Sequence, residues 1–204
     1  MKRFRASPRP MLSKLADGID RLNGAVGRAV AWLCLLMVLI GAWNAVARYV
    51  GRFIGVDLSS NLFIEAQWYL FSLLFLLGAA ATLRDDAHVR VDVLYGRLGP
   101  RGKAAIDLVG TLVFLLPFCV FGVVESWDWV ANSWQGREMS PDPGGLPRYP
   151  LKAVVPLAFG LLGLQGVSMA IRKGLLLAGA EPPSTATADT APDSLPAPQQ
   201  GGAP

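Results

Sequence analysis

The residues of this chain that could do chemistry lie at the two ends of one apolar segment. Residues 66–83 carry no charge, Glu65 precedes them, and a polar cluster at 84–92 follows them. A carboxylate at the mouth of a membrane span could couple transport to protons, because ionisable groups within a membrane are usually functional. Alternatively, Glu65 could stabilise the start of a helix or pair with Arg48 or Arg52 at the interface. We favour this structural role.

The polar cluster holds His88, the single histidine of the chain. Histidine beside carboxylates is a set of side chains that can bind a metal. The carboxylates close to it in sequence are Asp85, Asp86 and Asp92. Arginines of the same stretch, Arg84 among them, offer these carboxylates ion pairs, which we favour over a metal site. One histidine also falls short of the paired axial ligands of a membrane haem. We therefore expect no cofactor in this chain.

Composition points to a membrane protein. Of the 204 residues, 52% are hydrophobic and 17% are charged, against about 25% charged in an average soluble protein. The mean hydropathy is +0.40. The formal charge of +4 does not indicate a nucleic-acid partner, because the basic residues gather at loops on one side of the predicted membrane. The sequence lacks a nucleophile–base set, a phosphate-binding loop and a zinc motif, so we expect no enzymatic activity.

Four apolar blocks are each long enough to cross a bilayer as a helix, which takes about 20 residues. They lie near 29–47, 62–83, 106–127 and 153–171. Lipid offers no hydrogen bonds to the backbone, so each block must be helical. The sequence thus predicts an all-α integral membrane protein with a four-span domain at 29–175. Pro117, near the centre of the third span, predicts a kink or a local loosening of that helix.

The distribution of Lys and Arg predicts the orientation. Basic residues are concentrated in segment 1–28, in the loop between the second and third spans, and directly after the fourth. Since basic loops stay in the cytoplasm, both termini should be cytoplasmic. Segment 1–28 would include a short interfacial helix at 15–28. Residues 176–204, rich in Pro, Ala, Ser and Thr, are expected to form a disordered cytoplasmic tail.

The span interiors carry few polar side chains, and these are uncharged. Asn44 and Gln165 are expected to hydrogen-bond between helices, at about 0.6–2 kcal/mol each. A transport pathway would need more buried polar groups than this. The residues alone therefore favour an accessory membrane subunit.

Three motifs, in their order on the four spans, resemble a known family. Arg48-Tyr49-Val50 follows the first span, Glu65 opens the second with Trp68-Tyr69-Leu70-Phe71, and His88-Val89-Arg90-Val91-Asp92 precedes Leu98-Gly99-Pro100. From about 17 to 175 the chain is similar to the small, DctQ-like membrane subunit of TRAP (tripartite ATP-independent periplasmic) transporters. That family often has two acidic residues where this chain has Glu65 and Ala66, so a role that needs the pair is not implied here.

The resemblance implies a division of labour in a bacterial inner membrane. A periplasmic binding protein captures an organic acid, and a large permease subunit carries the substrate and the sodium ions. The small subunit scaffolds the large one and contributes to the docking surface. The structural and interface candidates are Asn44, Arg48, Glu65, Arg84, His88, Asp92 and Gln165. Two alternatives remain: an autonomous proton-coupled exporter that uses Glu65, and a membrane anchor of a redox complex. Substrate identity is not encoded in any of these residues.

Overall fold

The protein is a bundle of long helices. The structure, a computed structural model, describes residues 9–56, 58, 60–87, 95 and 97–179. Its elements are α1 (Arg9–Ile54), α2 (Asn61–Arg84), α4 (Pro100–Gly110), the π-helix η1 (Thr111–Leu115), α5 (Leu116–Gln135) and α6 (Tyr149–Leu177). All the regular elements of the described residues are helices, which confirms the predicted all-α class.

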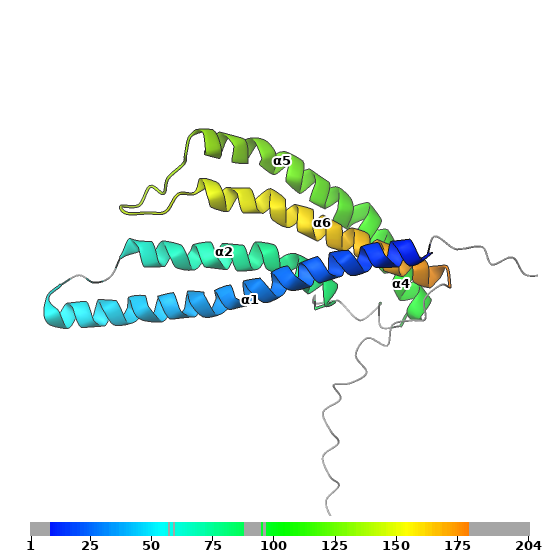
Figure 1. The fold of residues 1–204 in the computed structure, drawn as a ribbon, viewed down its shortest axis with the longest axis horizontal. Coiled ribbons are helices and arrows are strands. Elements are labelled where there is room, and N and C mark those ends of the chain that lie inside the picture. Colours follow the sequence, from blue (N-terminus) through cyan, green and yellow to red (C-terminus); the bar gives the residue numbers. More distant parts are fainter. Residues whose placement is uncertain (1–8, 57, 59, 88–94, 96, 180–204) are drawn as a thin grey trace, which may run out of the picture.

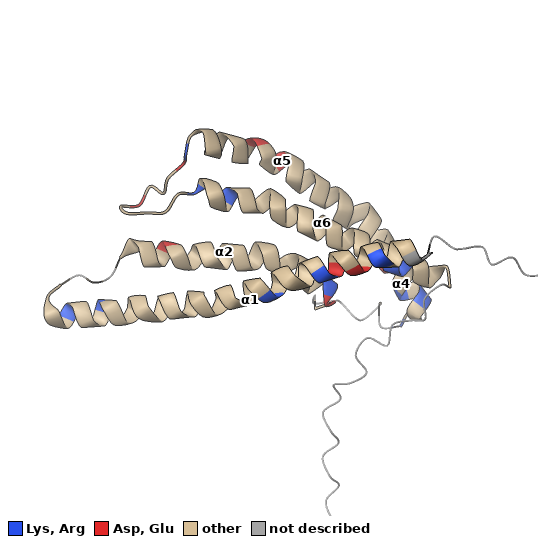
Figure 2. Cartoon of the chain, viewed as in Figure 1, with Lys and Arg blue, Asp and Glu red and all other residues tan. Residues whose placement is uncertain are grey.

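Four of these helices have the length and composition of membrane spans. They run over Met11–Ile54, Asn61–Arg84, Pro100–Gln135 and Tyr149–Leu177, which confirms the four-span layout. Each is longer than the apolar block that it contains. Figure 2 shows the charged residues gathered toward the ends of the bundle, with long uncharged stretches of helix between them.

The helices form two antiparallel hairpins, and α6 packs against both of them. α1 packs on α2 and α5 on α6, and α6 also contacts α1, α2 and α4 (Figure 1). The start of α1, the end of α6 and α4 gather at one end of the bundle, called here the terminal end. The α1–α2 and α5–α6 connections lie at the other, called the loop end, where the two hairpins stand further apart (Figure 1).

α1 is one continuous helix of 46 residues, so 15–28 is not a separate element, and the expected boundary at residue 28 falls inside a helix. No proline interrupts it after Pro10. Residues 15–28 pack into the bundle: Ala16 and Asn23 are at most 1% exposed. A Cβ on Gly27 would stand 2.6 Å from Cβ of Ala81, so a glycine is needed for α1 and α2 to approach this closely.

The third span is loosened where the sequence predicted it. A π-helix at Thr111–Leu115 separates α4 from α5, and Pro117 stands in the first turn of α5. Proline has no N–H to donate to the preceding turn, and its ring crowds the carbonyl four residues earlier. A widened turn just before it accommodates both defects.

Candidate functional site

Glu65 is buried at the loop end, where it holds the α5–α6 loop. Its exposure is 1%. Ser140 Oγ donates a hydrogen bond to Oε1, and the backbone N–H of Leu146 donates to Oε2 at 2.5 Å. The position follows from the start of α2. The Ser60 side chain accepts from the N–H of Leu62 at 3.3 Å as the N-cap, which places Glu65 in an early turn.

Tyr69, one turn after Glu65, ties down the same loop. Its hydroxyl donates to the carbonyls of Leu146 at 3.3 Å and Pro147 at 3.0 Å. Gly145 completes the fit, because a Cβ there would stand 2.8 Å from Glu65 Oε1 and 2.4 Å from Cβ of Ser140. We call Glu65, Tyr69, Ser140, Gly145 and Leu146 the Glu65 latch.

A second contact holds the base of the same loop. Glu138 accepts hydrogen bonds from Ser133 Oγ at 2.8 Å and from the ammonium of Lys152, which lies in the first turn of α6. The bond from Lys152, and then that from Ser133, lower the pKa of the Glu138 carboxyl below its usual range. Lys152 also lies over the ring of Trp129, 4.4 Å from its centroid, a favourable cation–π contact. The tip at 141–144 remains exposed.

At the terminal end a different carboxylate, Asp20, joins the first helix to the last. Its Oδ1 accepts from Ser168 Oγ at 2.7 Å and from Gln165 Nε2 at 2.9 Å. Its Oδ2 accepts from Arg172 Nε at 2.9 Å and Nη2 at 2.5 Å. Arg172 reaches Asp17 as well, at 2.8 Å. We call Asp20, Asn23, Gln165, Ser168 and Arg172 the Asp20 network.

Asn23 extends this network into the apolar part of the bundle. It is 1% exposed, and its Nδ2 donates to Gln165 Oε1 at 2.8 Å and to the carbonyl of Leu161 at 3.4 Å. Charge-assisted and neutral hydrogen bonds thus link α1 and α6 over two turns. Such links are strong where water is excluded.

Arg84 brings the end of α2 into the same region. It binds Asp85 Oδ1 through Nε and Nη2, both at 2.7 Å, and its Nη1 donates to the carbonyl of Asp20 at 3.3 Å. A Cβ on Gly24 would stand 1.7 Å from this Nη1. Gly24 is therefore what lets Arg84 cross the surface of α1.

Most of the predicted site residues lie in different parts of the bundle and do not form one site. Asn44 is 6% exposed, and its Oδ1 has no hydrogen-bond partner among the described residues. With Arg48, which is exposed, it lines a hollow of about 400 Å³ along α1. Glu65 and Arg84 lie at opposite ends of α2. Of the two structural roles considered for Glu65, helix-start stabilisation and pairing with Arg48 or Arg52, its hydrogen bonds show neither arginine as a partner, because the carboxylate binds the α5–α6 loop. His88 and Asp92 lie outside the described residues.

Sequence reasoning missed the partners of these candidates. Asp20, Asn23, Ser168 and Arg172 were not among the site candidates, and neither was Ser140. Tyr69 was named only as part of the motif that opens the second span. One signal was available: acidic residues flank the first span and Arg172 follows the last, so opposite charges meet if these helices pack at the same end. Nothing local marked the loop as the partner of Glu65, which is 75 residues away.

These contacts tie the helices and the α5–α6 loop to one another. Among the described residues, no group of three His, Cys, Asp or Glu is placed to hold a metal ion. Fixed donors occupy the carboxylate of Glu65, a hydroxyl and a backbone N–H, and that of Asp20, a guanidinium, a hydroxyl and an amide. The Asp107 carboxylate, with a side chain that is 7% exposed, accepts from the ammonium of Lys173 and the hydroxyl of Tyr95. The Glu65 latch and the Asp20 network thus stabilise opposite ends of the helical bundle.

The fold defines a multi-pass helical membrane protein with four spans. Residues 37–174 match the family of tripartite ATP-independent periplasmic transporters, DctQ component, and the chain belongs to that family. It is 30% identical over 127 residues to a Haemophilus influenzae protein that carries the provisional name TRAP transporter small permease protein, covering 60% of this chain and 73% of that one. No solved structure matches the chain.

The chain is thus a small subunit of a TRAP transporter. The family implies a non-catalytic role, a large permease subunit and a periplasmic binding protein as partners, and a place in the bacterial inner membrane.

Proposed function

We propose that this chain is the non-catalytic scaffold of a sodium-coupled transporter that imports an organic acid delivered by a periplasmic binding protein. The sodium and substrate sites would lie in the large permease subunit, and this chain would hold that subunit and contribute to the docking surface. The family supports the class of transporter. The observation that carries the scaffold role is the polar hollow on α1, where buried Asn44 leaves its carbonyl oxygen without a partner in the described residues.

A buried amide oxygen without a hydrogen bond is costly, so such groups normally find a partner. In this hollow the amide stands beside Arg48 and Arg52, and exposed apolar side chains share this face of α1: Val38, three residues before Gly41 of the lining, is 57% exposed, and Tyr49 is 66% exposed,. A helix of the large subunit could cover this face, with a donor for Asn44 and an acidic side chain for the arginines. An apolar face with one polar anchor is how membrane helices select a neighbour.

The loop end is the proposed docking surface for the binding protein. The Glu65 latch and the Glu138–Lys152 pair fix both sides of the α5–α6 loop, while its tip at 141–144 is exposed. A loop fixed before binding loses less entropy when a partner docks. With the termini in the cytoplasm, as the basic residues indicate, this loop would face the periplasm.

Co-purification with the large subunit of the same transporter tests the scaffold role. We expect the tagged wild-type chain to recover that subunit from membranes in mild detergent, and Arg48→Ala to recover clearly less. Arg101→Ala is the matched control, an exposed arginine on α4, and should behave as wild type. Recovery of the chain alone from cells that make both subunits would refute the proposal. So would substrate transport by the chain alone in proteoliposomes.

A further inference from the structure

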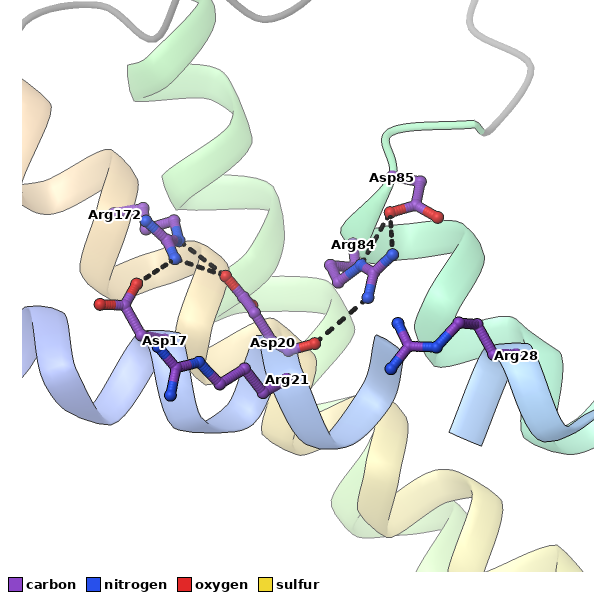
Figure 3. Close-up of a pocket in the computed structure, with 7 residues that line it drawn as sticks. All are labelled: Asp17, Asp20, Arg21, Arg28, Arg84, Asp85 and Arg172. Atoms are coloured by element: carbon purple, nitrogen blue, oxygen red, sulfur yellow. Dashed lines mark hydrogen bonds and ion pairs between the residues drawn. The ribbon is translucent and has the colours of Figure 1, made fainter. Parts of the chain in front are cut away.

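A hollow of about 620 Å³ opens at the terminal end, and arginines dominate its lining. It is bounded by α1, the end of α2 and α6 (Figure 3). Its lining residues are Asp17, Asp20, Arg21, Arg28, Arg84, Asp85 and Arg172. Four cations face three anions here, so the lining carries net positive charge.

The three carboxylates are already engaged. Arg172 binds Asp17 and Asp20, and Arg84 binds Asp85 (Figure 3). Within the part of the chain that the structure describes, Arg21 and Arg28 have neither an ion pair nor a hydrogen bond. Both are exposed. The hollow thus holds two guanidinium groups with no counter-charge from the described residues.

Arg28 and Arg84 also converge on one point. Their Nη1 atoms lie 3.7 Å and 1.7 Å from the position that a Cβ on Gly24 would occupy. Two like charges this close repel each other unless solvent or an anion lies between them. An oxyanion with several acceptor oxygens could accept hydrogen bonds from both guanidinium forks at once, the recognition for which arginine is best suited.

The position of these arginines relative to the apolar layer of the membrane indicates which kind of oxyanion they bind. Arg28 directly precedes the charge-free residues 29–47, Arg84 directly follows 66–83, and Arg172 directly follows 153–171. On three adjacent helices these are the first charges beyond the apolar layer. Lipid phosphates lie at that level of a bilayer, and basic pockets between membrane helices bind anionic head groups there.

The surface next to the hollow suits acyl chains. Trp32 and Leu35 follow Arg28 by four and seven residues, so they share its face of α1. They are 72% and 49% exposed. A tryptophan at this level is typical of the membrane interface. A lipid whose phosphate lay against Arg28 could therefore run its chains along this face.

We propose that the hollow between α1, α2 and α6 at the terminal end binds the phosphodiester of an anionic phospholipid of the phosphatidylglycerol class, held by Arg28 and Arg84 with Arg21 at the rim. A zwitterionic lipid would place its ammonium group among the arginines, which disfavours it. The site goes beyond the scaffold role and does not depend on it, because it requires only that the chain span a membrane.

Native mass spectrometry of the full-length chain tests this site. The chain is loaded in mild detergent with an equal mixture of phosphatidylglycerol and phosphatidylcholine that carry the same acyl chains. We expect preferential retention of phosphatidylglycerol. Arg28→Gln should lower that retention about fivefold, since a basic residue near an anionic surface contributes about 1 kcal/mol. Arg101→Gln removes an exposed arginine that does not line the hollow and should retain the lipid as wild type does.

Three results would overturn the proposal. One is equal retention of the two lipids by the wild-type chain. Another is an equal loss in the Arg28 and Arg101 variants, which would indicate non-specific attraction to charge. The third comes from adding inorganic phosphate at tens of millimolar: full displacement of phosphatidylglycerol would assign the hollow to free phosphate. An unchanged circular dichroism spectrum for Arg28→Gln ensures that lost lipid is not lost fold.

Discussion

The two ends of the bundle bury a carboxylate in different ways. Glu65 at the loop end is bound by neutral donors, the Ser140 hydroxyl and the Leu146 N–H, from a single loop. Asp20 at the terminal end is bound by a cation, Arg172, together with neutral side chains from α6. The Glu65 latch therefore shapes one connection, whereas the Asp20 network joins the first membrane helix to the last.

This difference indicates which end should tolerate change. At the loop end a backbone segment is fitted around the carboxylate, so a small steric change has no room. At the terminal end long side chains meet beside an open hollow of about 620 Å³, so they can move aside when a neighbouring residue becomes larger. Such movement does not replace a charge that has been removed. Loss of charge should be costlier at the terminal end and added volume costlier at the loop end.

The largest effect is expected from Asp20→Asn. The amide presents a donor to Arg172 and leaves that guanidinium without its main counter-charge. Removing one partner of a buried ion pair costs about 3–5 kcal/mol. This pair is partly exposed, Arg172 by 39% and Asp20 by 20%, so we expect a cost of about 2 kcal/mol,. The measurement is the unfolding free energy in mixed micelles titrated with dodecyl sulfate.

Asp17→Asn is the matched control for that measurement. Asp17 binds the same arginine, but its side chain is 51% exposed, so its loss should cost less than about 1 kcal/mol. Equal costs for the two variants would show that the Asp20 network does not hold α1 to α6.

Glu65→Gln should have the next largest effect, confined to the loop. The carboxamide keeps one acceptor oxygen and turns the other position into a donor, which then faces either the Leu146 N–H or the Ser140 hydroxyl. We expect the Leu146 amide to exchange with deuterium at least about tenfold faster, since hydrogen bonds to a charged acceptor are the stronger ones. Hydrogen-exchange mass spectrometry of peptides across 136–148 measures this.

Peptides from the first half of α1 serve as the internal control, because the latch does not touch them. Faster exchange over the whole chain would mean that Glu65 supports the entire bundle. An unchanged loop would mean that the latch contributes little.

The membrane spans could be predicted from the sequence, whereas the Glu65 latch and the Asp20 network could not. Charge-free stretches near bilayer length are a local signal, so four spans were recoverable, as was the loosened turn before Pro117. The hydrogen bonds of Glu65 and Asp20 join residues at least 75 positions apart, and no local pattern records them. The continuity of α1 was missed because the change from polar to apolar at residue 28 reads as a boundary, although nothing there breaks a helix.

Two glycine substitutions compare the ends directly. At Gly145 an added Cβ would stand 2.4 Å from Cβ of Ser140 and 2.8 Å from Glu65, atoms fixed by the latch. At Gly24 the contact would be with the end of the Arg84 side chain, at 1.7 Å, which can swing into the hollow. We expect Gly145→Ala to cost about 1–2 kcal/mol and Gly24→Ala about 0.5 kcal/mol or less, measured as above. The reverse order would contradict the distinction between the ends.

The smallest effect concerns the dependence of the loop end on pH. Because Lys152 and Ser133 lower the pKa of Glu138 in the folded chain, its contribution to loop stability is fully present above the ordinary carboxyl pKa of about 4.3. The contribution is lost as the pH falls through the lowered value. Exchange protection at 136–148 should therefore be constant from about pH 5 to 8, after correction for intrinsic rates, and should fall below about pH 4.5. Glu138→Gln should abolish the part of this fall that depends on Glu138. A fall of the same size in that variant would assign the acid sensitivity to another carboxylate of the loop.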